Sequence, residues 1–176
     1  RADRKLHRYM AIVAEWLQRL ALAGEEGYNY KAMYYFAYGS NMNLEHMRRI
    51  CGWHFTVLGG VILEDYQFGP DTRGYANIRP APGQKVYGLV YEVDQHCIDS
   101  LDEFEGYPTV FGRAEVVVKD FDGDEYKAWV YLEAPEYFGE DEIKEDYLKR
   151  VLIGARENRL PEEWIKFLTG FEKTKV

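Results

Sequence analysis

The sequence has few cysteines, few histidines and no long apolar run, and each shortage excludes a class of protein. Only Cys51 and Cys97 occur among 176 residues, too few for the disulfide framework of a small secreted domain. Neither they nor the four histidines show the spacing of metal ligands. No apolar stretch approaches the length that spans a bilayer. We therefore expect no metal site, no membrane partner and, by default for such a chain, a reducing cytoplasmic location.

Basic residues are scarce relative to acidic ones. The chain carries 22 Lys and Arg against 30 Asp and Glu, a net charge of −8. Because binding to a phosphate backbone needs a basic face, nucleic acid is not an expected partner. A secretion signal is not expected either. Residues 21–23 resemble a cleavage site, but Glu15, Gln18 and Arg19 interrupt the apolar core that a signal peptide needs.

Aromatic residues, by contrast, are plentiful, with 15 Tyr, 9 Phe and 4 Trp. Strands rich in tyrosine suit a sheet that lines a pocket with both apolar and hydrogen-bonding walls. The length is that of one domain, or of one domain with an appendage. The composition therefore favours a globular protein with a small-molecule pocket.

The appendage is expected at the N-terminus. Residues 6–22 place their apolar side chains on one stripe, which predicts an amphipathic helix that ends at Gly24. We divide the chain into an accessory segment, residues 1–32, and a main domain, residues 33–176. The extra helix carries no evident chemistry. Two roles for it stay open: packing on the main domain, or contacting a second subunit in a homodimer.

In the main domain the residue pattern predicts strands and helices without regular alternation. Strands are expected at residues 34–38, 55–63, 86–93, 113–119 and 125–132, the last two joined by an Asp-Gly hairpin. Residues 71–79 suggest a loop or irregular strand, and the proline-rich residues 80–83 a turn. Helices are expected after Asn41, from Asp94 to Gly106, over 142–153 and from Pro161. This arrangement indicates the α+β class.

The first strand ends abruptly at a glycine, and the residues there are candidates for binding an anion. Residues 38–42 (YGSNM) place small polar groups between an aromatic strand and a helix. The first N–H groups of a helix lack internal partners, and the helix dipole favours negative charge there. This geometry would hold a carboxylate or one phosphate. The alternative is a plain connection in which Ser40 and Asn41 only cap the helix.

Glu105 is the acidic residue whose position in its helix implies burial. The apolar residues Cys97, Ile98, Leu101 and Phe104 define one stripe, and Glu105 lies only about 50° from its centre. The acids at positions 102 and 103 lie about 110° and 150° away, toward solvent. Burial raises the pKa of a carboxyl, which suits it to acid–base catalysis near neutral pH. The alternative is that Glu105 turns to water or pairs with an arginine such as Arg113.

Three segments together resemble the gamma-glutamylcyclotransferase family, including its AIG2-like relatives. They are the YGSN loop at residues 38–41, the segment LDEFEG at residues 101–106, and the run GARENRLP at residues 154–161. Each motif alone is weak, but their order and spacing across residues 34–170 are specific. One departure concerns Phe111, which stands where many relatives have a tyrosine.

The resemblance implies a small mixed β-barrel flanked by helices, and an enzyme without metal or organic cofactor. It assigns the general acid/base to Glu105. It assigns substrate binding to Tyr38, Gly39, Ser40, Asn41, Met42 and Tyr147. The implied reaction is release of 5-oxoproline from a small-molecule gamma-glutamyl substrate, when the free α-amine attacks the side-chain carbonyl. The donor stays open between gamma-glutamyl amino acids and gamma-glutamyl-amines. A third alternative is a catalytically silent binding or interaction module of the same fold.

A truncation tests the predicted division of the chain. Removal of residues 1–32 should leave 5-oxoproline release intact, because every candidate site residue lies after Met33. Oligomeric state or solubility is expected to change if the helix forms a subunit contact. The measurements are turnover and light scattering on the full chain and the truncated chain. Loss of activity in a truncated protein with a cooperative melting transition would place the helix in the site.

Overall fold

A computed structural model describes residues 32–139 and 142–172. The predicted N-terminal helix over residues 6–22 lies outside the described residues. Within them, five strands form a closed barrel in the order β1-β3-β2-β4-β5. The strands are β1 (Met33–Ala37), β2 (Phe55–Pro70), β3 (Ala76–Val93), β4 (Gly112–Asp120) and β5 (Glu125–Leu132).

The barrel is mixed because one of its strand pairs is parallel. β1 pairs with β5 in parallel at Tyr34 and Tyr35, whereas it pairs with β3 in antiparallel register along its full length. β4 and β5 form the predicted Asp-Gly hairpin. The fold is therefore the mixed β-barrel of the α+β class that the resemblance implied.

Strands β2 and β3 are longer than the sequence pattern predicted. The predicted turn at residues 80–83 is wrong, because β3 runs through it and Pro80 pairs with Tyr66 of β2. The register shifts between Glu64 and Tyr66, and the Asp65 carboxylate accepts the Gly83 N–H at 2.8 Å. Proline is tolerated in such an irregularity because it need not donate to the ladder. The chain instead reverses at residues 71–75, where Asp71 Oδ1 accepts the N–H groups of Arg73 and Tyr75.

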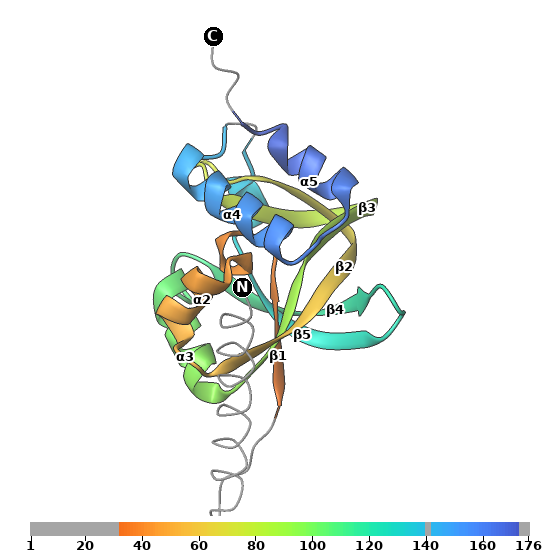
Figure 1. Ribbon diagram of the computed structural model, residues 1–176. Coiled ribbons are helices and arrows are strands. Elements are labelled where there is room, and N and C mark those ends of the chain that lie inside the picture. Colours follow the sequence, from red (N-terminus) through yellow and green to blue (C-terminus); the bar gives the residue numbers. More distant parts are fainter. Residues whose placement is uncertain (1–31, 140–141, 173–176) are drawn as a thin grey trace, which may run out of the picture. The chain divides into compact units, whose positions relative to one another are not determined.

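Helices cover two parts of the barrel (Figure 1). Helices α2 (Leu44–Cys51) and α3 (Gln95–Glu105) lie side by side. Helices α4 (Glu145–Glu157) and α5 (Glu162–Thr169) lie together, and Trp164 of α5 packs on Phe68 of β2 and Tyr87 of β3. Among the residues described, no helix is long and apolar enough to cross a membrane.

The ends of the helices follow local signals, although the register of α4 does not. Asp94 caps α3 by accepting the Cys97 N–H, and Gly106 ends it in a left-handed conformation with φ 67°. This ending makes Glu105 the last helical residue. Helix α4 begins and ends later than the predicted residues 142–153, since its buried face continues to Gly154 and Ala155.

The expectation for the two cysteines needs correction. Cys51 at the end of α2 and Cys97 in the first turn of α3 form a disulfide. Their separation of 46 residues gave no sign that the two helices are neighbours. The argument for a reducing compartment from cysteine usage therefore loses its basis.

Packing of α4 against the loop after β1 depends on Gly154. A Cβ atom at this position would lie 2.5 Å from the Met42 carbonyl carbon and 2.6 Å from the Asn43 nitrogen. Both are backbone atoms and cannot rotate away. We expect Gly154→Ala to destabilise the protein by about 1–3 kcal/mol despite the better helix propensity of alanine.

Thermal or urea denaturation measures this effect. Gly112→Ala is the matched control, because its nearest contact would be an ordinary 3.5 Å to the Leu132 oxygen. An unchanged or raised melting temperature for Gly154→Ala would contradict the close packing of α4 on the loop.

Candidate active site

The loop after β1 carries most of the predicted site residues. Ser40–Met42 form one 3₁₀ turn, and the following Asn43 caps α2 by accepting the His46 N–H at 2.9 Å. The cap of α2 is therefore neither Ser40 nor Asn41, both of which are buried. The simpler explanation of these two residues as helix caps is wrong.

Two backbone N–H groups of the loop already have hydrogen-bond acceptors within the protein. Ser40 N–H donates to the hydroxyl of Tyr147 on α4 at 3.3 Å, and Met42 N–H donates to the Gly39 carbonyl at 3.1 Å. A side chain at position 39 would collide with the Tyr147 hydroxyl, so glycine allows this close approach. Tyr147 thus reaches the loop from a helix more than one hundred residues later in the chain.

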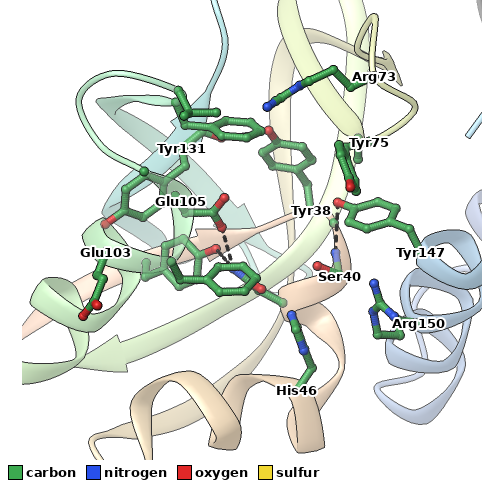
Figure 2. A pocket seen from close by; sticks show the side chains of 18 of the residues that line it. Tyr38, Ser40, His46, Arg73, Tyr75, Glu103, Glu105, Tyr131, Tyr147 and Arg150 are labelled. Atoms are coloured by element: carbon green, nitrogen blue, oxygen red, sulfur yellow. Dashed lines mark hydrogen bonds between the residues drawn. The ribbon is translucent and has the colours of Figure 1, made fainter. Parts of the chain in front are cut away.

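Glu105 meets the loop through one hydrogen bond. Its Oε1 accepts from Asn41 Nδ2 at 2.9 Å, and the same Nδ2 donates to the Tyr35 hydroxyl at 2.8 Å (Figure 2). Burial raises the pKa of the Glu105 carboxyl to about 7, although the Asn41 hydrogen bond and the charge of Arg73 act to lower it. A carboxyl with this pKa exchanges a proton readily near neutral pH.

The alternative role for Glu105, an ion pair with Arg113, is wrong. Arg113 Nη1 donates to both carboxylate oxygens of Asp102 at 2.8 Å. Asp102, which the helical pattern placed toward solvent, is also held by the Tyr131 hydroxyl at 2.6 Å. Phe104 was expected in the buried stripe, but half of it is exposed (50%). The position of Glu105 itself followed the pattern: it faces inward, and part of it stays accessible from a cavity.

That cavity has a volume of about 570 Å³ and brings the predicted residues together. Its walls include Tyr38, Gly39, Ser40, Asn41, Glu105 and Tyr147. Met42 does not line it, because its side chain is fully buried in the core behind the loop. The sequence therefore predicted most of these cavity residues, but it did not predict that the Met42 side chain is buried behind the loop.

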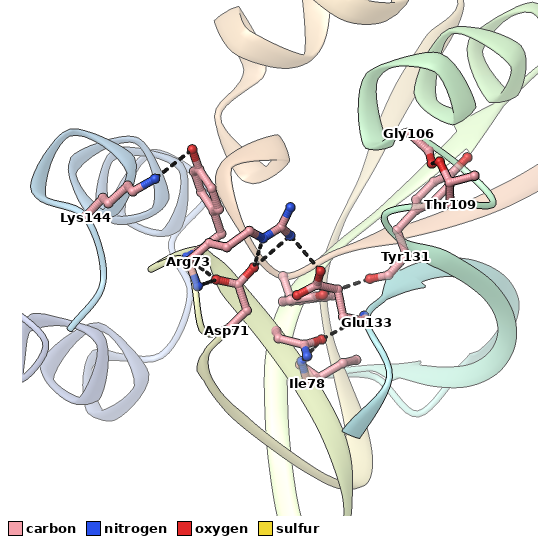
Figure 3. A network of polar contacts seen from close by, with 11 residues as sticks. Asp71, Arg73, Ile78, Gly106, Thr109, Tyr131, Glu133 and Lys144 are labelled. Carbon is pink, nitrogen blue, oxygen red and sulfur yellow. Dashed lines mark hydrogen bonds and ion pairs between the residues drawn. The ribbon is translucent and has the colours of Figure 1, made fainter. Parts of the chain in front are cut away.

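Sequence reasoning missed a polar network at one side of the cavity. Arg73 Nη2 donates to Asp71 at 2.9 Å and to Glu133 at 2.7 Å (Figure 3). Burial opposes ionisation of Asp71, but hydrogen bonds from Tyr75, Glu133 and Arg73 outweigh it and lower the Asp71 pKa. Burial and the neighbouring Asp71 raise the pKa of Glu133 to about 7. The buried pair therefore holds the Arg73 guanidinium in the cavity wall.

Arg73 lines the cavity, whereas Arg79, six residues later, does not. Arg79 instead stacks on Phe138 at 4.1 Å. Phe111, the departure from the tyrosine of many relatives, lines the cavity, with Arg73 over its ring at 5.5 Å. Within residues 32–139 and 142–172, no group of three or more His, Cys, Asp or Glu is arranged to hold a metal ion.

Comparison with known proteins agrees with this geometry. The family model described as gamma-glutamyl cyclotransferase, AIG2-like, matches residues 35–150. Gamma-glutamylcyclotransferase of Mus musculus is 32% identical over 163 residues, 85% of this chain and 82% of the relative. A solved structure of a gamma-glutamyl cyclotransferase superposes with a TM-score of 0.75 at 26% identity, over 83% of this chain and 91% of that one.

A shorter match is to gamma-glutamylaminecyclotransferase A of Danio rerio, 44% identical over 54 residues, 30% of this chain and 34% of the relative. The chain belongs to the gamma-glutamyl cyclotransferase, AIG2-like family. It is an enzyme of the gamma-glutamylcyclotransferase type.

The hydrogen bond that Asn41 donates to Glu105 leads to a testable prediction for the pKa of Glu105. Asn41 donates to the ionised carboxylate, so Asn41→Leu should raise the Glu105 pKa above its value of about 7. Carbon-13 NMR titration of the glutamate carboxyls measures this shift. Thr109→Val is the control, because Thr109 donates only to the Gly106 carbonyl nearby. A Glu105 pKa that stays the same or falls in Asn41→Leu would show that the hydrogen bond does not tune it.

Proposed function

We propose that this enzyme releases 5-oxoproline from a gamma-glutamyl amino acid or gamma-glutamyl-amine. The free α-amine of the glutamyl group attacks its own side-chain carbonyl carbon, and a new carbon–nitrogen bond closes the ring. The bond to the leaving nitrogen breaks. The attacking amine loses one proton and the leaving nitrogen gains one, so the reaction needs no redox partner.

Proximity supplies much of the rate. Because both reacting groups belong to one substrate, the protein needs only to hold the glutamyl chain in a curled conformation. The cavity of about 570 Å³, with aromatic walls from Tyr38 and Tyr147, is large enough for a dipeptide-sized donor. These side chains would shape the bound conformation.

Glu105 carries the proposal as the group that moves the proton. Its carboxyl lies in the cavity with a pKa of about 7, held by Asn41 and not paired with Arg113. As carboxylate it takes the proton from the attacking amine, and as carboxylic acid it returns the proton to the leaving nitrogen. One residue then serves both halves of the reaction.

The loop residues Gly39, Ser40 and Asn41 are proposed to bind the substrate. Loop N–H groups other than those of Ser40 and Met42, which already donate to Tyr147 and Gly39, would stabilise a carboxylate or the oxyanion that develops on the attacked carbonyl. The Tyr147 hydroxyl lies beside the Ser40 N–H and offers a further donor. Met42 would contribute only through packing behind the loop, since its side chain is buried and its backbone N–H and carbonyl are engaged by Gly39 and Asn158.

Substitution of Glu105 tests this assignment. Glu105→Gln should lower the rate of 5-oxoproline release by about 10²–10⁴-fold, the usual contribution of general acid–base catalysis. The assay measures 5-oxoproline from gamma-glutamyl-alanine, gamma-glutamyl-lysine isomers and glutathione. Asp99→Asn, an exposed carboxyl on the same helix, is the matched control and should keep wild-type activity. A fully active Glu105→Gln protein would refute the role of Glu105.

The same variant gives a pH-dependent stability readout. The folded-state pKa of Glu105 lies above its unfolded value of 4.5, so folding favours the protonated form. Wild type therefore loses stability relative to Glu105→Gln as pH rises from about 4.5 through 7. Melting temperatures should be similar at about pH 4.5 and higher for the variant at about pH 8. The reverse order would show that Glu105 is stabilised as carboxylate.

A further inference from the structure

One end of the cavity carries two buried nitrogen atoms that have no partner. His46 Nε2 on α2 and Arg150 Nε on α4 are both inaccessible to solvent and make no hydrogen bond within the part of the chain that the structure describes. Both residues line the cavity. Figure 2 shows both side chains below Ser40, with Glu105 on the other side of Ser40. Arg150 has no hydrogen-bond or ion-pair partner among the described residues, so the donors of its guanidinium that face the cavity remain available to a ligand.

The charges around these two atoms favour an anion. The Arg150 guanidinium lies 5.8 Å from the centre of the Tyr147 ring and makes no ion pair with a carboxylate of the described residues. Burial and the positive charges of Arg150 and Arg49 lower the pKa of His46. Its imidazole is therefore neutral near pH 7 and can donate one N–H. Arg49 also lines the cavity, and it forms an exposed ion pair with Glu45 on the same helix.

Negative groups are held elsewhere in the cavity. Glu105 is bound to Asn41, and Glu103 lies on the α3 side, as Figure 2 shows. The ring of Phe104 contacts the His46 ring edge-on, with 5.3 Å between the ring centres. The end of the cavity at His46 and Arg150 is thus positively charged and supplied with donors.

We propose that His46 and Arg150 form a carboxylate-binding subsite for the donor substrate. This inference rests on the proposed function, which supplies two carboxylates. One is the α-carboxylate of the glutamyl group, and the other belongs to the amino acid that leaves. Either would accept from Arg150 and His46, with charge-assisted hydrogen bonds to the guanidinium. A simple gamma-glutamyl-amine lacks the second carboxylate. If the subsite binds that carboxylate, it favours gamma-glutamyl amino acids over such amines as donors.

Three donors that differ by one carboxylate distinguish the two sources. Gamma-glutamyl-alanine carries both groups, and gamma-glutamyl-ethylamine lacks only the carboxylate of the leaving group. The third, 4-aminobutanoyl-alanine, lacks only the α-carboxylate and would cyclise to 2-pyrrolidinone. The proteins are wild type, Arg150→Met, Arg150→Lys and His46→Leu. Arg156→Met, an exposed arginine on the same helix, is the control.

The value of kcat/KM for gamma-glutamyl-alanine should fall about 10- to 100-fold in Arg150→Met, mainly through KM. Arg150→Lys should retain part of the wild-type kcat/KM. The fall in kcat/KM should be smaller for His46→Leu than for Arg150→Met. If the loss disappears with gamma-glutamyl-ethylamine, the subsite binds the leaving amino acid. If it disappears with 4-aminobutanoyl-alanine, the subsite binds the α-carboxylate. An equal loss with all three donors, or no loss, would overturn the proposal.

Binding to an inactive protein separates this inference from the proposed function. Calorimetric titration of gamma-glutamyl-alanine into Glu105→Gln, with and without Arg150→Met, needs no turnover. Weaker binding after Arg150→Met, with unchanged binding after Arg156→Met, supports the subsite even if wild type releases no 5-oxoproline. Equal affinity of the Glu105→Gln protein with and without Arg150→Met would overturn the subsite even if the wild-type enzyme is active.

Discussion

The hydrogen bond between Asn41 and Glu105 connects the two segments on which the site depends. Asn41 lies in the loop that leaves β1, and Glu105 is the last residue of α3, more than sixty positions later. The disulfide between Cys51 and Cys97 joins α2 to α3, so the helix that follows the loop is bonded to the helix that ends at Glu105. Capping by Asp94 and the left-handed Gly106 fix where α3 begins and ends. The carboxyl is thereby held beside the loop while it stays buried enough for its pKa to rise.

Close packing of α4 provides the opposite wall. Gly39 and Gly154 both lie where a side chain would collide, the first with the Tyr147 hydroxyl and the second with the backbone of Met42 and Asn43. Because α4 approaches this closely, Tyr147 reaches the loop and Arg150, one turn later, reaches the same cavity. The two glycines therefore allow the approach that brings side chains of α4 to the cavity.

Local patterns predicted the features that depend on neighbours in sequence. The YGSN loop, the inward side of Glu105 and the Asp-Gly hairpin all follow from residues within one turn or one strand pair. Features that depend on distant segments were missed. Pro80 suggested a turn, although β3 continues through it in an irregular pairing with β2. No residue near Cys51 in the sequence indicated that it is bonded to Cys97. His46 and Arg150 lie on ordinary helical positions, and only the approach of α2 and α4 to one loop makes them neighbours.

Arg73 connects Glu105 electrostatically to a second carboxyl with a raised pKa. Its positive charge lowers the pKa of Glu105, while Asp71 and Glu133 compensate that charge from behind. When Glu133 is protonated, only Asp71 opposes Arg73, and the stabilisation of the Glu105 carboxylate is strongest. When Glu133 ionises, two carboxylates share one guanidinium, and its effect on Glu105 weakens. Burial raises the pKa of each glutamate to about 7, and the charge of Arg73 acts to lower both. The proton affinity of the Glu105 carboxyl is thus set partly by Arg73, which Asp71 and Glu133 hold in place.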